Sequence, residues 1–302
     1  MAWAKSRKLL FYCLFIAVPV IHYLVFYVYI NFNSILMSFR TYGIRDGALT
    51  YWFAGGRNFK QAFTVLGGSW SRIFTSLLFL AIQLFVCTPL ALVFSYYLYK
   101  KRPGTEFFKV MLFMPQLLSA VVFGTLYRYL AGDVYIALMN KLFHKEASNL
   151  LNELKTQLGA MILFNIAMSF GVNVLTYTGT MSGINQSLIE SAQLDGCTPF
   201  KEFIHIVVPM TWPTIVTLAI VSFAKMFTEQ YHVFTVLGRS PGRAENIGYF
   251  LYTEALDSDL QAVGRHYAYP VLSAIGLILT MIVLPLTLGL RKVLNTYGPR
   301  VD

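Results

Sequence analysis

The chain has 302 residues, of which 56% are hydrophobic, 16% aromatic and 13% charged, and its formal net charge is +10. A composition this apolar excludes an ordinary soluble domain and indicates that the lipid bilayer is the solvent. The Lys and Arg residues stand beside apolar runs and form no basic face interleaved with aromatic residues. Lipid head groups, and not nucleic acid, are therefore the expected counter-charge.

Six apolar segments are long enough to cross a hydrocarbon core of about 30 Å, which takes about 20 helical residues each. In chain order they are residues 9–32, 72–98, 107–131, 157–178, 210–234 and 268–290. The first has basic residues before it, as a signal peptide does, but its apolar run is too long and no small-residue cleavage site follows. The sequence predicts an all-α integral membrane protein with six transmembrane helices.

Basic residues at the ends of the segments predict the orientation. Three lie in the N-terminal tail, three in the turn at residues 100–102 and three in the C-terminal end, and six spans place all of them on one side. Residues 40–72 also carry Arg and Lys and would lie outside, but long loops count less in this rule. Both termini are predicted to be cytoplasmic.

A polar connection at residues 183–209 separates the fourth and fifth segments, on the predicted cytoplasmic side. Asn185 or Ser187 can cap a first short helix, and Gly196 can adopt the left-handed turn that ends it. Thr198-Pro199 can cap and begin a second short helix. Two helices joined by a fixed elbow suit docking to a protein partner.

Taken singly, residues of this connection have a simpler interpretation, in which Ser187 and Glu190 form a capping box and Asp195 is an ordinary solvated residue. As a set, they resemble the EAA motif of the membrane subunits of ATP-binding-cassette (ABC) importers. That motif has Glu, two small residues, Asp-Gly at the fifth and sixth places after the Glu, then Phe and Ile-x-x-Pro. The matching residues are Glu190, Ala192, Asp195, Gly196, Phe203, Ile206 and Pro209, with the small residues Ser191 and Cys197 at two further positions.

The resemblance extends over nearly the whole chain and is to the carbohydrate-uptake branch, the maltose and glycerol-3-phosphate type of permease. The segments that carry it are 51–59 before the second span, 107–115 in the third, 236–241 in an outer turn and 267–269 at the start of the last. Ala167 and Met168 depart from it, since the family has an aromatic and a basic residue there, and so does Ile30, where a proline is common. These departures do not change the expected fold. They do mean that the identity of the cargo is not carried over from the family.

The resemblance implies a type I ABC importer permease fold with a cytoplasmic EAA coupling helix-turn-helix. Its parts would be a tail, first span and outer loop at 1–71, a permease core at 72–291 with the coupling loop at about 183–209, and a cytoplasmic tail at 292–302. It also implies partners in the plasma (inner) membrane: a second homologous permease subunit in a heterodimer, an ATPase subunit dimer that the coupling residues contact, and an extracytoplasmic solute-binding protein. The expected function is ATP-driven import of a sugar or oligosaccharide.

We expect no enzymatic activity and no bound cofactor in this chain. It contains no Gly-x-x-x-x-Gly-Lys-Ser/Thr loop, so ATP and Mg would bind the partner ATPase. Residues 238–242 match Gly-x-Ser-x-Gly, but Pro241 follows the serine and has no N–H for an oxyanion hole. The five histidines and three cysteines show no metal-ligand spacing.

Polar side chains within the apolar segments are candidates for lining a translocation pathway, because a helix facing lipid does not tolerate them. The candidates are Gln83 in the second span, Asn165, Ser169, Asn173, Thr176 and Thr178 in the fourth, and Glu229, Gln230, Tyr231 and His232 in the fifth.

Each group of candidates has an alternative role. Lys225 and Glu229 face the interior or pair with each other, or Lys225 reaches the interface at the end of the span while Glu229 is already in water. For Asn165 and Asn173 the alternative is hydrogen bonding between helices. The function has alternatives too: the same mechanism with phosphate, an amino acid or a polyamine as cargo, or a stand-alone secondary transporter or channel.

Overall fold

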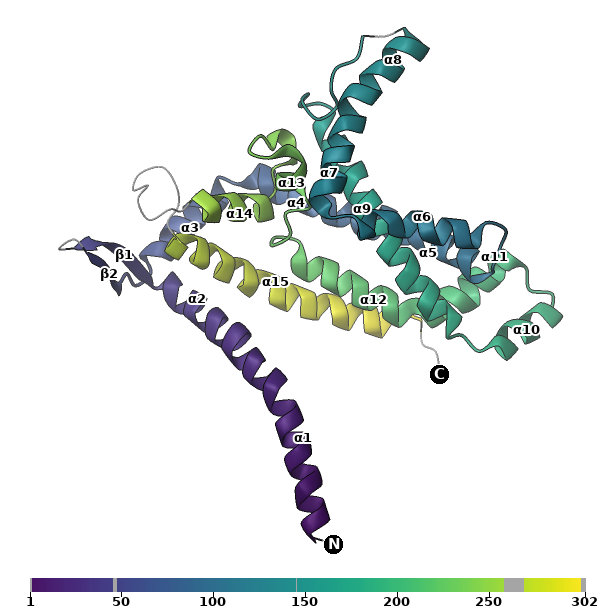
Figure 1. Ribbon diagram of the computed structural model, residues 1–302, viewed down its shortest axis with the longest axis horizontal. Helices are drawn as coiled ribbons and strands as arrows, with labels where there is room; N and C mark the ends of the chain where they lie inside the picture. The colour runs from purple at the N-terminus through teal and green to yellow at the C-terminus, as the bar shows by residue number, and fades with distance from the viewer. Residues whose placement is uncertain (1, 46–47, 145, 258–268, 300–302) are drawn as a thin grey trace. The chain divides into compact units, whose positions relative to one another are not determined.

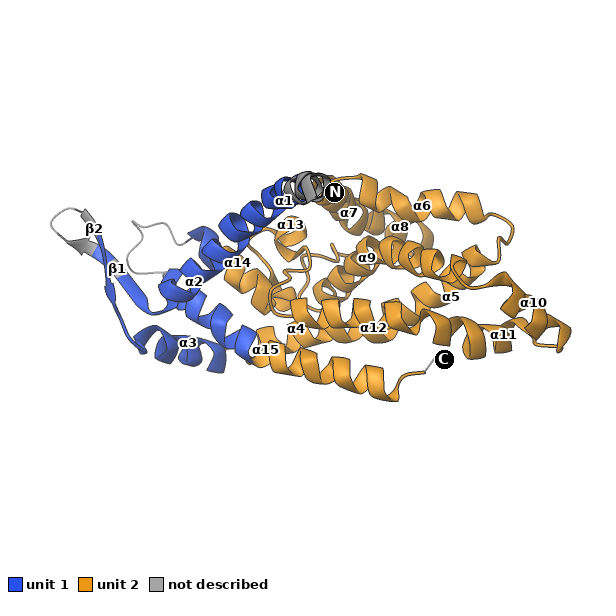
Figure 2. Ribbon diagram, turned by 90° about the horizontal axis from the view of Figure 1, so that it is seen from below, with its two compact units in different colours: residues 1–68, 254–281 blue, residues 69–253, 282–302 orange. Residues whose placement is uncertain are grey.

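This computed structural model describes residues 2–45, 48–144, 146–257 and 269–299. The described chain is almost entirely helical, with one short hairpin (Figure 1). It divides into two compact units: residues 1–68 with 254–281, and residues 69–253 with 282–302 (Figure 2). The segment 267–269, expected at the start of the last span, lies partly outside the described residues.

The smaller unit begins with one long helix in three consecutive parts, α1 (Ala2–Tyr23), a π-helical turn (Leu24–Tyr29) and α2 (Ile30–Ser38). The antiparallel strands β1 (Arg40–Arg45) and β2 (Ala48–Phe53) and helix α3 (Arg57–Gly67) follow. The buried Asn58 donates its amide to Ser38 O at 2.9 Å and to Arg40 O at 2.7 Å. This side chain therefore fixes the end of α2 to the start of the hairpin.

The larger unit is a bundle of helices. Its helices in chain order are α4 (Trp70–Ile82), α5 (Thr88–Tyr99), α6 (Thr105–Leu117), α7 (Ala120–Tyr129), α8 (Tyr135–Phe143), α9 (Gln157–Ser182), α10 (Gln186–Leu194), α11 (Pro199–Glu202), α12 (Val208–Lys225) and α13 (Val233–Leu237). Three π-helical turns, Gln83–Cys87, Leu130–Val134 and Phe203–Val207, join consecutive helices into longer ones. The last two helices, α14 (Ile247–Asp257) and α15 (Tyr269–Tyr297), contribute residues to both units.

Five helices of the described chain are long and apolar enough to cross a membrane: Phe11–Ser38, Trp70–Tyr99, Gln157–Ser182, Pro199–Lys225 and Tyr269–Tyr297. A bent pair supplies the sixth candidate, because Thr105–Leu117 and Ala120–Phe143 meet at 103°. The third predicted segment, at 107–131, is therefore bent at a break and is not one straight helix. Leu118 is extended, and Ser119 caps the next helix by accepting a hydrogen bond from Val122 N at 3.2 Å.

The fifth predicted span, at 210–234, is shifted along the chain. Its helix begins at Pro199 and ends at Lys225. It starts earlier because Thr198 and Pro199 begin a helix that continues through a π-helical turn into α12. It ends before the predicted limit, because residues 226–228 form turns. Tyr231 and His232 then adopt left-handed backbone angles, which a helix does not contain. The last helix continues to Tyr297, into the segment that we expected to be a tail.

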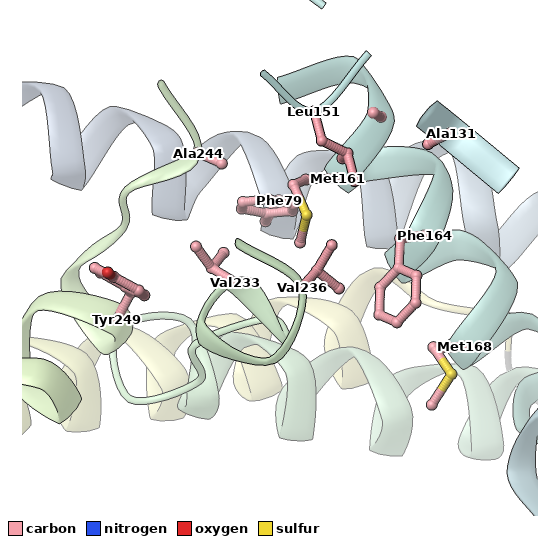
Figure 3. Close-up of a cluster of buried hydrophobic side chains, with 11 residues drawn as sticks. Phe79, Ala131, Leu151, Met161, Phe164, Met168, Val233, Val236, Ala244 and Tyr249 are labelled. Carbon is pink, nitrogen blue, oxygen red and sulfur yellow. The ribbon is translucent and has the colours of Figure 1, made fainter. Parts of the chain in front are cut away.

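A buried apolar cluster packs the larger unit together near the middle of α9 (Figure 3). Met161 and Phe164 of α9 lie against Phe79 of α4 and against Val233 and Val236 of α13. These side chains come from segments far apart in sequence, so the cluster joins α4 and α9 to α13, which follows the end of α12. Helix α9 alone carries five of the ten polar candidates.

Gly171 is where α9 and α6 approach most closely, because a Cβ at this position would lie 2.0 Å from Leu112 O. We predict that Gly171→Ala forces the two helices apart and destabilises the protein by about 1–3 kcal/mol. The matched control is Gly179→Ala in the same helix, where a Cβ meets nothing within 4 Å. The midpoint of unfolding by SDS titration measures both variants, and equal midpoints would contradict the prediction.

Candidate functional site

The polar connection after α9 folds into the two short helices that the sequence predicts. Asn185 Oδ1 accepts a hydrogen bond from Ser187 N at 3.1 Å, so Asn185 and not Ser187 caps α10. Gly196 ends the first helix with a φ of +80°, and Thr198 caps the second, in which Pro199 is the first residue. The connection is therefore a helix, a left-handed elbow and a second helix, projecting at one end of the larger unit (Figures 1 and 2).

The residues that match the EAA motif fall into two groups, one exposed and one packed against the rest of the larger unit. Glu190 and Asp195 are exposed, and within the described chain neither carboxylate has a hydrogen bond or ion pair. Phe203 turns inward and packs its ring 5.1 Å from that of Tyr96 in α5, and Ile206 packs on the same buried cluster. Outward acids and inward apolar residues leave one face of the elbow open to a partner.

Two exposed apolar side chains of the elbow were not among the sequence candidates. Leu194, at the end of α10, is 90% exposed, and Phe200, in α11, is 72% exposed. Both flank the Gly196 elbow. Their signal in the sequence is that they are the two large apolar residues between Ile189 and Phe203, where the other residues are small or polar.

The larger unit also contains a cavity of about 590 Å³ between α4, α9 and the end of α12. Seven of the ten sequence candidates line it: Gln83, Asn165, Ser169, Asn173, Glu229, Tyr231 and His232. Thr176, Thr178 and Gln230 do not. The hydroxyls of Thr176 and Thr178 bond to their own helix at Val172 O and Val174 O. The sequence missed the lining residue Gln116, which lies beside the break between α6 and α7.

Hydrogen bonds connect the polar groups on the cavity wall. Ser169 Oγ lies 3.1 Å from Gln83 Oε1 and 2.8 Å from Asn165 O. Asn165 Nδ2 donates to Met161 O at 2.8 Å and to Tyr231 O at 2.9 Å. Gln83 begins a π-helical turn, an irregularity found often at functional sites. The asparagine therefore both lines the cavity and bonds to another segment, so the two roles considered for it coexist.

The turn after α12 forms one wall of the cavity in a strained conformation. Tyr231 and His232 have φ angles of +50° and +57°, and neither is glycine. Such residues cost about 1–3 kcal/mol each unless their surroundings hold them. The Tyr231 ring stacks on Phe79 at 4.7 Å and 11°, and its carbonyl accepts the Asn165 amide. Asn246, fully buried, also donates to the carbonyl of the preceding residue, Gln230.

The two titratable rings of this turn are shifted toward their neutral forms. Burial raises the pKa of the Tyr231 phenol, with a smaller contribution from Glu229, and burial lowers the pKa of the His232 imidazole. The charged groups that line the cavity are Lys225 and Glu229. Among the ion pairs of the described residues there is none between these two, so the predicted pairing is not observed.

The comparisons with known proteins agree with this architecture. A family model described as "binding-protein-dependent transport system inner membrane component" matches residues 62–301. The chain belongs to this family. It is thus a membrane-spanning permease, a transport subunit in a family that is not one of enzymes.

Individual relatives extend the match along the chain. The arabinooligosaccharides transport system permease protein AraP of Bacillus subtilis is 28% identical over 297 residues, covering 94% of this chain and 88% of AraP. The multiple sugar-binding transport system permease protein MsmF of Streptococcus mutans is 24% identical, over 89% of this chain and 90% of MsmF.

Solved structures share the fold. A chain in the crystal structure of a bacterial ABC transporter involved in the import of the acidic polysaccharide alginate has a TM-score of 0.77 and 18% identity, with 98% of each chain covered. A chain in the alginate transporter in complex with an alginate pentasaccharide-bound periplasmic protein has a TM-score of 0.75 and 17% identity, over 95% of this chain and 94% of that chain. The permease described here therefore has the type I ABC importer fold that the EAA resemblance implied.

Proposed function

We propose that this permease carries a sugar or oligosaccharide, which an extracytoplasmic solute-binding protein delivers and a separate ATPase dimer drives inward. The observation that carries the proposal is the exposed elbow of α10 and α11, with its free acids and large apolar side chains, in a member of the binding-protein-dependent family. A stand-alone transporter or channel has no need for such a surface.

The elbow is the proposed docking surface for the ATPase. Leu194 and Phe200 are suited to the centre of an interface, because exposed large apolar side chains become anchors when a partner buries them. Glu190 and Asp195 would then meet basic or N–H groups of the ATPase. Two short helices are small beside a standard interface of about 800 Å² per partner. Stable docking thus needs both membrane subunits, and we propose that the second is a different, homologous chain.

The cavity is the proposed binding place of the cargo within the membrane subunit. Amide and hydroxyl groups of Gln83, Gln116, Asn165, Ser169 and Asn173 offer the donors and acceptors that sugar hydroxyls need. Its volume of about 590 Å³ lies within the usual range of ligand sites. AraP and MsmF are named as permeases of arabinooligosaccharide and multiple-sugar transport systems, which supports the same class of cargo here.

The proposed topology puts the elbow and both termini in the cytoplasm of a cell whose plasma (inner) membrane holds the chain. The basic residues of the N-terminal tail, of residues 100–102 and of the C-terminal end support this orientation. ATP and Mg would bind only to the ATPase partner.

Purification of the complete complex tests the proposal. The chain is co-expressed with its candidate second permease and ATPase, reconstituted in lipid, and assayed for ATP hydrolysis with different binding proteins and solutes. We expect the ATPase to co-purify and a sugar-loaded binding protein to stimulate hydrolysis. Stimulation by phosphate, an amino acid or a polyamine instead would reassign the cargo, and uptake that needs no ATPase would refute the importer mechanism.

Leu194→Ala is predicted to weaken binding of the ATPase by about 2 kcal/mol, a factor of about thirty, because it removes an anchor from the centre of the surface. Folding should not change, since the side chain is 90% exposed. Leu154→Ala is the matched control, because Leu154 is 58% exposed in the segment between α8 and α9. Titration of the ATPase onto the reconstituted membrane subunits measures both affinities, and equal values would contradict the docking surface.

A further inference from the structure

Glu202 is the only charged side chain that is buried among the residues the structure describes, with an exposed fraction of 2%. It is the last residue of α11, next to the open face of the elbow. A carboxylate taken out of water costs several kcal/mol unless it is paired and hydrogen-bonded. The residues around it therefore determine what it does.

The partners of this carboxylate come from three segments. The Lys100 ammonium forms an ion pair with Oε1, and the Tyr96 hydroxyl lies 3.1 Å from the same oxygen and 3.1 Å from Pro199 O. Gln193 Nε2 donates to Oε2 at 3.3 Å. Tyr96 lies in the last turn of α5, Lys100 follows that helix, and Gln193 belongs to α10. One side chain thus joins α5 to both short helices of the elbow.

The ammonium group of Lys100 is also partly buried and lies near two aromatic rings. The Lys100 side chain is 20% exposed, and its Nζ lies 5.6 Å and 5.7 Å from the ring centroids of Tyr96 and Tyr99. Aromatic faces at this distance attract a cation. The pair of Lys109 and Glu106 in α6 is different, because its carboxylate side is 86% exposed and such surface pairs contribute little.

Both helices that this cluster joins continue to the cavity. Tyr96 belongs to the unbroken helix Trp70–Tyr99, on which Gln83 lines the cavity 13 residues away, about 20 Å along the axis. Glu202 belongs to the helix Pro199–Lys225, whose last residue lines the same cavity. A rigid connection at this end therefore couples the elbow to two walls of the cavity.

We propose that Glu202 is a positioning residue for energy coupling. Its buried ion pair with Lys100 makes α5, α10 and α11 move as one body, so that a displacement of the elbow reaches the cavity wall through α5 as well as through α12. This role rests on the proposed function, in which an ATPase displaces the elbow. Without the pair, the elbow still binds the ATPase, but part of its motion is lost before it reaches α5.

The test uses the complete reconstituted complex with the double variant Glu202→Gln, Lys100→Met, which removes both charges and leaves no unpaired one. The matched control is Glu106→Gln, Lys109→Met, which neutralises the exposed pair of α6. We expect both variants to retain the ATPase and to hydrolyse ATP. Solute transported per ATP hydrolysed should fall about tenfold in the Glu202 variant and stay at the wild-type value in the control. Equal ratios in the two variants would overturn the proposal.

A second measurement needs no change at the pair. Spin labels replace Val93 in α5 and Ser187 in α10, which are both exposed, in the otherwise intact complex. The distance between them should change by less than about 2 Å when ATP closes the ATPase dimer. A larger change shows that the elbow moves independently of α5. It overturns the role proposed for Glu202 but leaves the proposed function standing. Absence of the ATPase from the purified wild-type complex overturns the proposed function instead.

Discussion

Gly196→Pro should abolish binding of the ATPase and solute uptake, while Gly196→Asn leaves both near their wild-type values. Gly196 has a φ of +80°, and its N–H donates to Gln193 O at 3.0 Å. Proline is locked near a φ of about −65° and has no N–H, so it removes both the turn and this hydrogen bond. Asparagine tolerates the left-handed region, and a Cβ at this position meets nothing within 4 Å.

Comparing these two substitutions distinguishes the effect of the backbone angle at residue 196 from the effect of adding a side chain there. We expect the affinity for the ATPase to fall by at least about a hundredfold in Gly196→Pro, because the two anchors on either side of the elbow no longer face the same partner surface. Membrane insertion should be unchanged, as measured by the amount of chain in the membrane fraction. Uptake at the wild-type rate in Gly196→Pro would exclude this elbow as the coupling surface.

Glu190→Ala tests the acidic part of the same surface. Its carboxylate has no partner within the described chain, so its loss should change the free energy of unfolding by no more than about 0.5 kcal/mol. Combined with Gly196→Pro, it should leave no detectable uptake in proteoliposomes. Uptake that survives both substitutions would favour a stand-alone transporter.

Asn165→Leu should lower solute uptake about tenfold without weakening binding of the ATPase, because it removes a partly buried hydrogen bond from the cavity wall. A tenfold change corresponds to about 1.4 kcal/mol. The side chain donates to Tyr231 O at 2.9 Å and so holds the strained turn that forms one wall of the cavity. Leucine has a similar size but no donor, which leaves the Tyr231 carbonyl without this partner. The turn is then free to leave its left-handed conformation.

Thr176→Val is the matched control for this substitution. Thr176 also lies in α9 and also loses one polar group, but it is exposed and its hydroxyl bonds only to Val172 O of its own helix. Initial rates of uptake, with ATP hydrolysis measured in the same vesicles, compare the two variants. A loss of uptake in Thr176→Val equal to that in Asn165→Leu would mean that the cavity is not the pathway.

Sequence patterns located the elbow accurately because its signals are local. Asn185, Gly196 and the Thr198-Pro199 pair specify caps and a turn through bonds within four residues and through their own backbone preferences. Seven polar candidates line one cavity. For the four that lie in helices, Gln83, Asn165, Ser169 and Asn173, the reason is that a polar side chain in an apolar helix must face something other than lipid.

Other features depended on contacts that no local pattern encodes. Apolar composition predicts that a segment is long enough to span, but it does not show that Leu118 breaks the third span or that Lys225 ends the fifth helix. The place of Gln116 on the cavity wall could not be predicted, because it depends on that break. The ion pair of Glu202 could not be predicted either, because its partner Lys100 is about a hundred positions away in the sequence.

The sequence by itself determined that this protein spans a membrane and which family its polar connection resembles, because hydropathy, turn residues and motif spacing are properties of neighbouring residues. Only the tertiary structure decided which polar groups share a cavity, why Tyr231 and His232 hold a strained turn, and that a buried carboxylate joins the elbow to α5. Those properties depend on burial and on distances between segments remote in sequence, and burial changes the free energy of a charge or a hydrogen bond by several kcal/mol.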